Sequence, residues 1–258
     1  MVTAQRTTGM SWIHVGSMGW SYDFWKGNFY PKNLASNEFL AYYSRQFDTV
    51  EVDSTFYRIP SKKTVLDWRE QTPNDFIFSL KFPQIITHVK MLRNCEEETQ
   101  VFFKHAEFLE EKLGPLLLQF PPTFRDDCMP FLREFLERLP KRHRYVVEVR
   151  KKTLLTDSLY EILGDSGVAL AWVESPFMPL ISELTSDFIY VRWEGDRKTI
   201  RGTFGKTEVD RTGEIAFWAD KLKPFRVRKM EVFGYFSKYY SGFPPSDIST
   251  FLESTKMS

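Results

Sequence analysis

The sequence predicts an α/β fold, a single TIM (β/α)8-type barrel, and two observations lead to this class. Apolar, β-rich runs alternate with stretches whose apolar residues recur every three or four positions, as in repeated βα units. Eight such runs fit into 258 residues, the usual length of this barrel. A Rossmann fold is the runner-up, but Gly16 and Gly19 lack the spacing of its glycine fingerprint.

The predicted strands are taken in chain order, and amphipathic stretches lie between most of them. The strands are expected at 14–20, 49–53, 76–82, 115–120, 144–150, 168–174, 188–194 and 229–236. The sixth unit is expected to be shortened or degraded, because 175–187 contains Pro176 and Pro179 and leaves room for one or two helical turns. The longest irregular segment, 195–212, follows the seventh strand.

Composition and termini suggest where such a protein works. Residues 1–12 read as a frayed leader without an apolar signal region, followed by one barrel domain over 13–258. No stretch has the 18 or more apolar residues of a membrane span, so we expect no membrane association. Cys95 and Cys128 form neither a disulfide framework nor a zinc motif, which favours a reducing, cytoplasmic setting. Nothing in the sequence specifies an oligomeric state.

Strand parity predicts a charged site inside the barrel. Alternate residues of a strand share a face, and the outer face must be apolar where helices cover it. Five strands therefore direct polar side chains inward near their carboxyl ends, at the open mouth. These are Glu51 and Asp53; Ser79 and Lys81; Glu148 and Arg150; Trp172 and Glu174; and Tyr190, Arg192 and Glu194.

The mixed signs of these charges suggest acid/base chemistry on a small ligand. Glu51 and Glu148 are the proton-transfer candidates, and Lys81 and His88 complete the catalytic set. Lys81, Arg150 and Arg192 are suited to hold an anion. The alternative is a purely structural salt-bridge network that braces the barrel.

Further residues around the mouth are expected to bind the substrate. Aromatic residues make up 16% of the chain, and several rings follow the predicted strands. Flat rings suit a sugar, a nucleobase or another planar ligand. For any single ring, capping the core is the better interpretation, but together the rings favour a pocket. The expected binding residues are Trp20, Tyr22, Asp53, Thr55, Tyr57, Gln119, Arg150, Glu174, Arg192 and Tyr235.

The sequence gives little indication of a metal cofactor or of binding to a long polyanion such as nucleic acid. A divalent metal held by Glu51, Glu148, Glu174 and His88 is conceivable, but Lys81 and Arg150 would oppose it, so we expect none. The formal charge of +1 gives no bulk attraction for nucleic acid.

The loop predicted after the seventh strand is the most basic segment near the mouth. It contains Arg197, Lys198, Arg201 and Lys206, which suit either an anion contact or a solvated loop.

Several motifs, in order, carry a family resemblance. They are Gly19-Trp20-Ser21-Tyr22, Phe29-Tyr30-Pro31, Val50 to Pro60, Thr87-His88, Gln119-Phe120-Pro121-Pro122, Glu148-Val149-Arg150 and Tyr190-Val191-Arg192. From about Ile13 to Phe251 the chain resembles the YecE-like family, domain of unknown function seventy-two. The resemblance implies a TIM barrel and a cytoplasmic protein, without an assigned reaction.

The chain departs from the pattern of that family at four places. Lys151 to Leu154 replace a His and a Ser-Trp pair, Glu174 replaces Asp, Glu194 replaces His, and Ser237-Lys238 replace paired Asn. Two lost histidines weaken any scheme that uses them as bases or metal ligands.

The leading expectation is an enzyme, a hydrolase, isomerase or lyase, that acts on a small polar or phosphorylated substrate. Nucleic-acid processing is an alternative that is not favoured, and a non-catalytic binder of small molecules is another.

Overall fold

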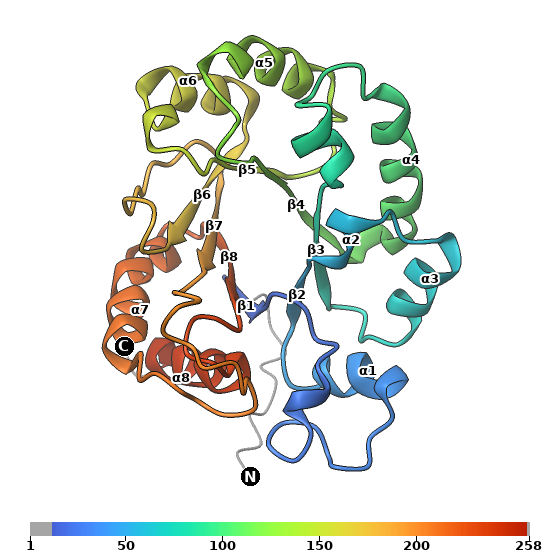
Figure 1. Cartoon of the computed structure of the whole chain (residues 1–258), viewed down its shortest axis with the longest axis vertical. Helices are drawn as coiled ribbons and strands as arrows, with labels where there is room; N and C mark the ends of the chain where they lie inside the picture. Colours follow the sequence, from blue (N-terminus) through green and yellow to red (C-terminus); the bar gives the residue numbers. More distant parts are fainter. Residues whose placement is uncertain (1–11, 257–258) are drawn as a thin grey trace.

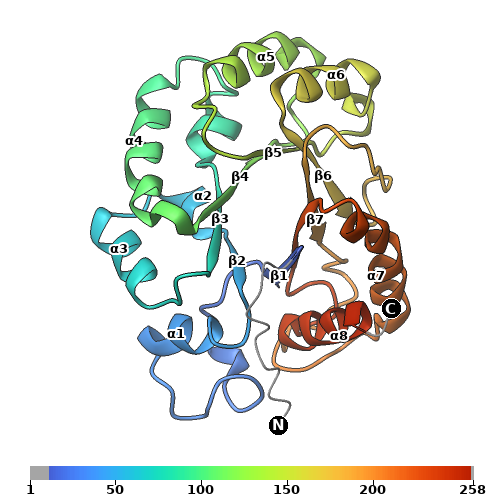
Figure 2. The same cartoon turned by 180° about the vertical axis from the view of Figure 1, so that it is seen from behind.

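All eight predicted strands are present in a computed structural model that describes residues 12–256. They are β1 (Ile13–Ser17), β2 (Thr49–Val52), β3 (Ile77–Lys81), β4 (Leu113–Gln119), β5 (Tyr145–Glu148), β6 (Ala169–Glu174), β7 (Phe188–Trp193) and β8 (Glu231–Phe236). The strands pair in parallel in the order β1-β8-β7-β6-β5-β4-β3-β2. Figures 1 and 2 show them as an inner ring surrounded by helices, which confirms the predicted barrel. The predicted leader lies outside the described residues, apart from Trp12.

Backbone pairing between neighbouring strands is sparse at two places in the ring, between β1 and β2 and between β5 and β6. Between β1 and β2 a bridge joins Met18 to Glu51, whose carbonyl accepts the Gly19 amide at 2.8 Å. Between β5 and β6 two residue pairs align, whereas β7 and β8 align over six. These two places, the β1–β2 and β5–β6 seams, divide the barrel into β2–β5 and β6–β8 with β1.

Helices cover the outer face of the strands, as the apolar periodicity predicts (Figures 1 and 2). The α-helices are α1 (Phe39–Tyr43), α2 (Ser54–Tyr57), α3 (Lys62–Glu70), α4 (Glu96–Ala106), α5 (Met129–Arg138), α6 (Asp157–Ser166), α7 (Thr212–Val227) and α8 (Pro244–Lys256). Short 3-10 turns occupy Asp23–Trp25, Ser36–Glu38, Glu107–Lys112, Asp126–Cys128 and Lys152–Leu154, and Ile85–Val89 forms a π-helical turn.

Local sequence sets several helix ends. The Ser61 hydroxyl accepts the Thr64 amide at 3.1 Å and thus caps the start of α3. Gly167 has a φ of 65°, which only glycine adopts without strain, and it ends α6.

The sixth unit lacks its helix, which confirms the prediction. Residues 175–187 form turns and extended chain between β6 and β7. Thr185 secures this connection, because its hydroxyl donates to the Val168 carbonyl at 2.7 Å and accepts the Leu170 amide at 2.8 Å. The Trp172 indole donates to the Glu183 carbonyl at 2.9 Å. An extended segment therefore covers β6 where a helix would normally lie.

Strand parity separates an inner from an outer core. Val50, Phe78 and Val147 join the large core beneath the helices, while Tyr190 and Tyr235 belong to a smaller cluster inside the barrel. Polar residues point inward on β2, β3, β5 and β7, as predicted. The prediction is wrong for β6, because Ala169 and Ala171 belong to the inner cluster and Trp172 packs on Phe225 of α7. Small residues are needed inside so that the larger inward side chains of neighbouring strands fit.

A histidine occupies the end of the barrel opposite the mouth. His14 of β1 contacts the Asp48 carboxylate through Nδ1 at 2.7 Å and the Glu231 carboxylate through Nε2 at 3.0 Å. Burial acts to lower the pKa of His14, but these two bonds outweigh it and raise the pKa to about 9. The imidazolium therefore joins the amino ends of β1, β2 and β8.

Candidate active site at the barrel mouth

Arg192 of β7 lies at the centre of the inward-facing charges. Its guanidinium forms a bidentate pair with Glu51 of β2, with Nε to Oε2 at 3.0 Å and Nη2 to Oε1 at 2.7 Å. Its Nη1 contacts Glu148 of β5 and Glu194, each at 2.5 Å. Nη2 also lies 3.3 Å from the Met18 sulfur. One guanidinium thus binds three carboxylates from three different strands or strand ends.

Glu51 has no contact with solvent. It is 0% exposed, and the Tyr190 hydroxyl donates to its Oε2 at 2.6 Å in addition to the bonds from Arg192. Burial raises the pKa of Glu51, although the charge of Arg192 opposes this effect. The carboxylate of Glu51 is thus closed off from solvent and bonded on both oxygens to Arg192.

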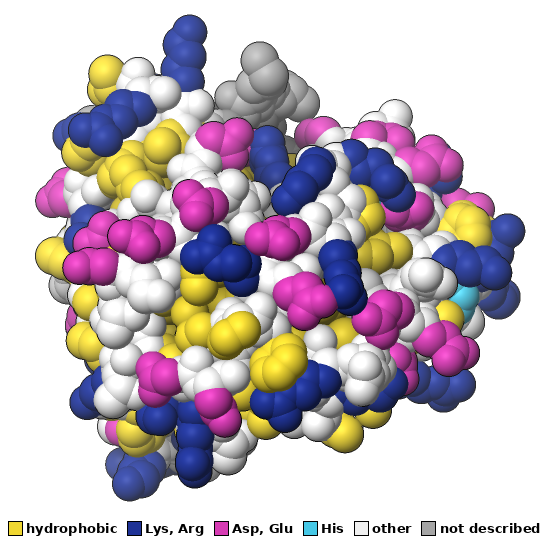
Figure 3. All heavy atoms as spheres, turned by 90° about the horizontal axis from the view of Figure 1, so that it is seen from above, with side chains coloured by type: hydrophobic (Ala, Val, Ile, Leu, Met, Phe, Trp, Pro, Cys, Tyr) yellow, Lys and Arg dark blue, Asp and Glu magenta, His cyan; other side chains and the backbone are white. Residues whose placement is uncertain are grey.

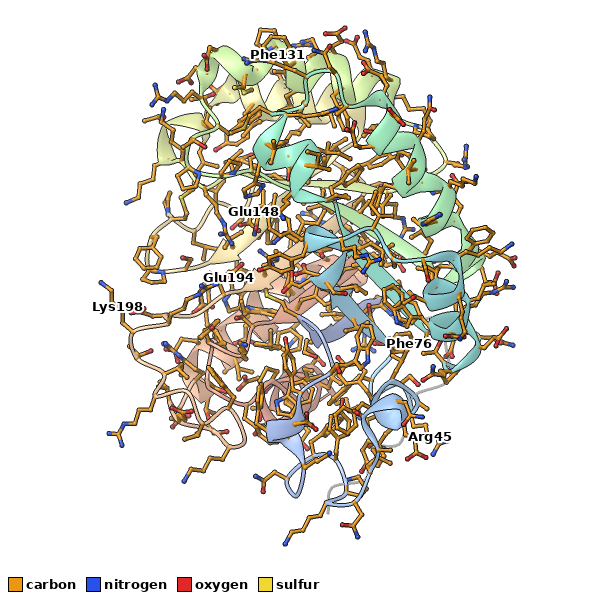
Figure 4. The ribbon with its side chains drawn as sticks, turned by 45° about the vertical axis from the view of Figure 1, so that its right-hand side comes forward. Arg45, Phe76, Phe131, Glu148, Glu194 and Lys198 are labelled. Atoms are coloured by element: carbon orange, nitrogen blue, oxygen red, sulfur yellow. The ribbon has the colours of Figure 1, made fainter. Side chains whose placement is uncertain are left out.

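Glu148 is held in a similar way from the other side. Its Oε1 accepts bonds from Gln119 Nε2 at 2.8 Å and from Arg150 Nε at 3.0 Å. Burial acts to raise the pKa of Glu148, but Arg192 and Arg150 outweigh it and hold the pKa below its usual range. Figure 4 shows Glu148 and Glu194 near each other, away from the periphery of the molecule. Both carboxylates pair with Nη1 of Arg192.

Lys81 differs from these paired groups. The residue is 8% exposed, yet its Nζ lies 3.8 Å from Asp53 Oδ1 and 4.3 Å from the centre of the Phe56 ring. Among residues 12–256 its Nζ has no hydrogen-bond acceptor, and the buried Asp53 Oδ1 has no hydrogen bond either. Burial lowers the pKa of Lys81, Asp53 opposes this, and Arg192 adds to it. The amine of Lys81 is therefore available to a ligand, whereas Asp53 Oδ1 is closed off from solvent.

His88 flanks the same space. Its ring lies edge-on to Phe56, with centroids 4.8 Å apart, and Nδ1 is 2.9 Å from the Thr87 hydroxyl. Burial and the charges of Lys81 and Arg150 lower the pKa of His88 to about 4. At neutral pH His88 is therefore an uncharged hydrogen-bonding group.

Thr55 and Tyr235 support the site from behind. The Thr55 hydroxyl contacts the Val52 carbonyl at 2.8 Å and the Lys81 carbonyl at 2.7 Å, which fixes the end of β3. The Tyr235 hydroxyl lies 2.8 Å from Thr49 Oγ1 and 2.7 Å from Ser79 Oγ, deep in the barrel. Both residues are 0% exposed, and both hydroxyls are hydrogen-bonded within the barrel wall.

The structure does not bring every predicted residue to this space. Glu174 lies on the outer face of β6, where its Oε2 accepts from the Trp218 indole and from Tyr240 at 3.4 Å. The predicted inward orientation of Glu174 is therefore wrong, for the same steric reason as that of Trp172. The conceivable metal set of Glu51, Glu148, Glu174 and His88 is not assembled, and no group of three metal-ligating side chains occurs within 12–256.

The predicted aromatic ring around the mouth is only partly formed. Trp20 packs edge-on against Trp68 of α3 and Phe78, so it belongs to the layer between barrel and helices. Tyr22 donates to the Met18 carbonyl at 2.6 Å and is half-buried. Tyr57 is 73% exposed, which leaves its ring free at the rim.

The loop after β7 is ordered by a carboxylate. Glu208 accepts bonds from the Thr203 hydroxyl and from the amides of Arg201, Thr203 and Phe204, and these bonds lower its pKa. Lys198 projects outward at the periphery of the molecule, away from Glu148 and Glu194 (Figure 4). The basic side chain of Lys198 therefore lies outside the cluster around Arg192.

The predicted set of site residues omits two partners in the site. Phe56 supports both Lys81 and His88, and Met18 contacts Arg192. Phe56 follows the charged end of β2, and this position in the sequence could have identified it as a site residue. Nothing in the sequence around Met18 indicates that its thioether contacts Arg192.

Comparison with known proteins agrees with the resemblance. The family model described as protein of unknown function DUF72 matches residues 14–258. UPF0759 protein YecE of Escherichia coli (strain K12) is 38% identical over 138 residues, 54% of this chain and 48% of that protein. UPF0759 protein YunF of Bacillus subtilis (strain 168) is 32% identical over 123 residues, 45% of this chain and 42% of that protein. The matched parts span about half the length of these relatives.

Solved structures match over nearly the whole chain. A DUF72 family protein (TM1631) from Thermotoga maritima MSB8 has a TM-score of 0.82 and 27% identity, over 95% of this chain and 99% of that one. A DUF72 family protein (EF0366) from Enterococcus faecalis V583 has a TM-score of 0.73 and 20% identity, over 95% and 96%. The Thermotoga maritima structure supports both the fold and the family, and the Enterococcus faecalis structure supports the fold.

Among the helices of residues 12–256, none combines the length and the hydrophobicity that a membrane-spanning helix requires.

Proposed function

The chain belongs to the DUF72 family, whose description assigns no function. We propose that it is an enzyme that binds a small polar or anionic substrate beside Lys81. The observation that carries the proposal is the position of Lys81 Nζ at the mouth, where the residue is 8% exposed and, among residues 12–256, the amine has no hydrogen-bond acceptor. An ammonium group offers three donors, and an anion or hydroxyl placed beside Lys81 can accept from them in place of water.

Proton transfer is the chemistry that these groups support. The lowered pKa of Lys81 increases the fraction of neutral amine that can accept a proton at physiological pH. Neutral His88 can donate or accept a hydrogen bond beside it, and the half-exposed guanidinium of Arg150 can bind a carboxylate or phosphate. In this proposal Glu51 and Glu148 position Arg192 and do not touch the substrate.

The test uses hydrogen exchange, because it detects proton abstraction even when the product is unidentified. Purified protein is incubated in D₂O with a panel of sugar phosphates and hydroxy acids, and deuterium incorporation or new products are followed by NMR. We expect turnover of at least one compound, and a loss of at least about 100-fold in Lys81→Met, the scale of a general acid–base residue.

Lys62→Met is the matched control, because Lys62 Nζ also lies over a ring, 4.6 Å from the Phe108 centre, on the exposed face of α3. This variant is expected to keep full turnover. Equal activity in Lys81→Met and Lys62→Met would contradict the role of Lys81, and absence of both exchange and binding across the panel would contradict the proposed substrate class.

A further inference from the structure

A cavity lies in the helical layer, on elements separate from those of the mouth. It is formed by the loop before α4, by α4 and by α5, and its volume is about 520 Å³. Apolar lining residues include Leu92, Phe103, Phe131, Phe135 and Leu139. Figure 4 places Phe131 on α5 at the outside of the molecule, far from Glu148. We call this cavity the α4–α5 pocket.

The floor of the α4–α5 pocket is apolar and well packed. Phe103, Phe135 and Leu139 are buried, and the first two contact Phe82 with ring centroids 6.0 and 6.2 Å apart. Figure 3 looks onto the end of the molecule that carries α5 and shows apolar side chains reaching the surface between charges of both signs. A cavity of this size with an aromatic lining matches the sites that bind drug-sized molecules.

Arg93 supplies the polar recognition group at the rim. Its guanidinium carbon lies 4.2 Å from the centre of the Phe131 ring. This cation–π contact does not use the N–H groups, and within residues 12–256 none of the five N–H donors of the guanidinium has a hydrogen-bond acceptor. Within residues 12–256, no carboxylate lies within ion-pair distance of Arg93, so the group is held in place with its hydrogen-bonding capacity unused.

The other charges around the pocket are already paired. Arg138 of α5 donates to Glu96 of α4 at 3.0 Å and also to Glu134. These bonds leave Arg93 as the lining cation that an incoming anion can engage without breaking an ion pair.

The loop that carries Arg93 adopts an unusual backbone. Met91, Leu92 and Asn94 have φ values of 49°, 67° and 48°, in the left-handed region that residues other than glycine seldom occupy. Leu92 is directed into the pocket wall and Arg93 to its rim in this conformation. Strain of this kind is retained where the surrounding structure enforces it, often at ligand sites.

From these observations we propose that the α4–α5 pocket binds a small carboxylic acid with an aromatic or branched apolar body. The carboxylate pairs with the in-plane donors of Arg93, and the apolar body lies against Phe103, Phe135 and Leu139. A planar, two-oxygen anion matches the fork of a guanidinium better than an alcohol or an amine does. This site is independent of the proposed function of the mouth.

The experiment compares three probes that share one body: 3-phenylpropionate, 3-phenylpropanol and 3-phenylpropylamine. Binding to the full chain is measured by ligand-observed NMR and calorimetry. The acid is expected to bind, and the alcohol and amine to bind at least tenfold more weakly. Equal or tighter binding of the amine, or no binding of the acid at millimolar concentration, would overturn the proposal.

Variants locate the site. Arg93→Gln should weaken acid binding at least tenfold, and Phe131→Ala should weaken it as well by removing the stacking platform. Arg45→Gln is the matched control, because Arg45 is exposed and lies far from Phe131 (Figure 4).

Arg93 is itself exposed, so the Arg93→Gln variant should fold normally, which circular dichroism checks. Unchanged affinity in Arg93→Gln overturns the site, whereas Lys81→Met should bind the acid normally whether or not the mouth is catalytic.

Discussion

Arg192 shows how one buried side chain can determine the energetics of a barrel interior. Substitution of Arg192 by Met removes the guanidinium but leaves Glu51 and Glu148 buried. Breaking one side of such a network typically costs about 3–5 kcal/mol. We expect Arg192→Met to lower the free energy of unfolding by that amount in urea titrations. Arg150→Met is the control, since Arg150 is half-exposed and should cost less than about 1 kcal/mol. Similar losses in the two variants would contradict this account.

His14 gives the protein a pH dependence of stability that is separate from the mouth. Its pKa is about 9 in the folded protein and about 6.5 when unfolded, so its bonds to Asp48 and Glu231 stabilise the fold fully below pH 6.5. This contribution is lost as the pH rises through 9. It amounts to about 3 kcal/mol if each pKa unit is worth about 1.4 kcal/mol.

The measurement is the stability gap between the wild type and His14→Gln in urea at pH 6 and at pH 9.5. We expect the gap to shrink at the higher pH. A gap that stays constant or widens would show that His14 is not charged in the folded state.

The strands were largely predictable, because the alternation that identifies a strand depends only on residues close together in the sequence. Period-two alternation and the need for an apolar outer face identified eight strands and the inward direction of Glu51, Lys81, Glu148 and Arg192. The same rule failed on β6, where Ala171 and Val173 take the inward positions. The width of the barrel interior decides that register, and a single strand carries no information about the size of its neighbours' side chains.

The pairings within the site were less predictable than the positions. Parity places Glu51, Glu148 and Arg192 at one mouth, but it does not say that Arg192 binds both carboxylates or that Lys81 Nζ has no hydrogen-bond acceptor within residues 12–256. That difference depends on side-chain reach across the barrel. For this reason the proposed function assigns proton transfer to Lys81, whereas the sequence led us to expect it from Glu51 and Glu148.

Gly16 allows the first two strands to approach each other. A Cβ at this position would lie 2.1 Å from the Thr49 carbonyl oxygen and 3.1 Å from the Tyr43 hydroxyl oxygen. Since backbone cannot move aside cheaply, we expect Gly16→Ala to destabilise the protein by about 3 kcal/mol. Gly164→Ala is the control, because Gly164 lies in α6 with no atom near the added methyl group, and the change should stabilise by up to about 1 kcal/mol. Thermal unfolding distinguishes the two, and a neutral Gly16→Ala would contradict the close approach.

At the scale of the molecule, the prediction of one domain over residues 13–258 implies cooperative unfolding. All eight strands belong to one sheet, and Arg192 links strands from both parts of it. Urea transitions followed by tryptophan fluorescence and by far-ultraviolet circular dichroism should therefore coincide. Two separated transitions would indicate that the parts of the barrel fold independently.

The two seams of the barrel give Arg192 a further consequence. Glu51 lies on β2 and Glu148 on β5, and these are the two outer strands of the β2–β5 half. Arg192 belongs to the opposite half, so its two glutamate pairs cross the β1–β2 seam and the β5–β6 seam respectively. Opening either seam must break a buried ion pair as well as a few backbone bonds. The guanidinium thus closes the barrel where main-chain pairing is weakest, and we expect amide hydrogens along β2 and β5 to owe part of their protection from exchange to a side chain on β7.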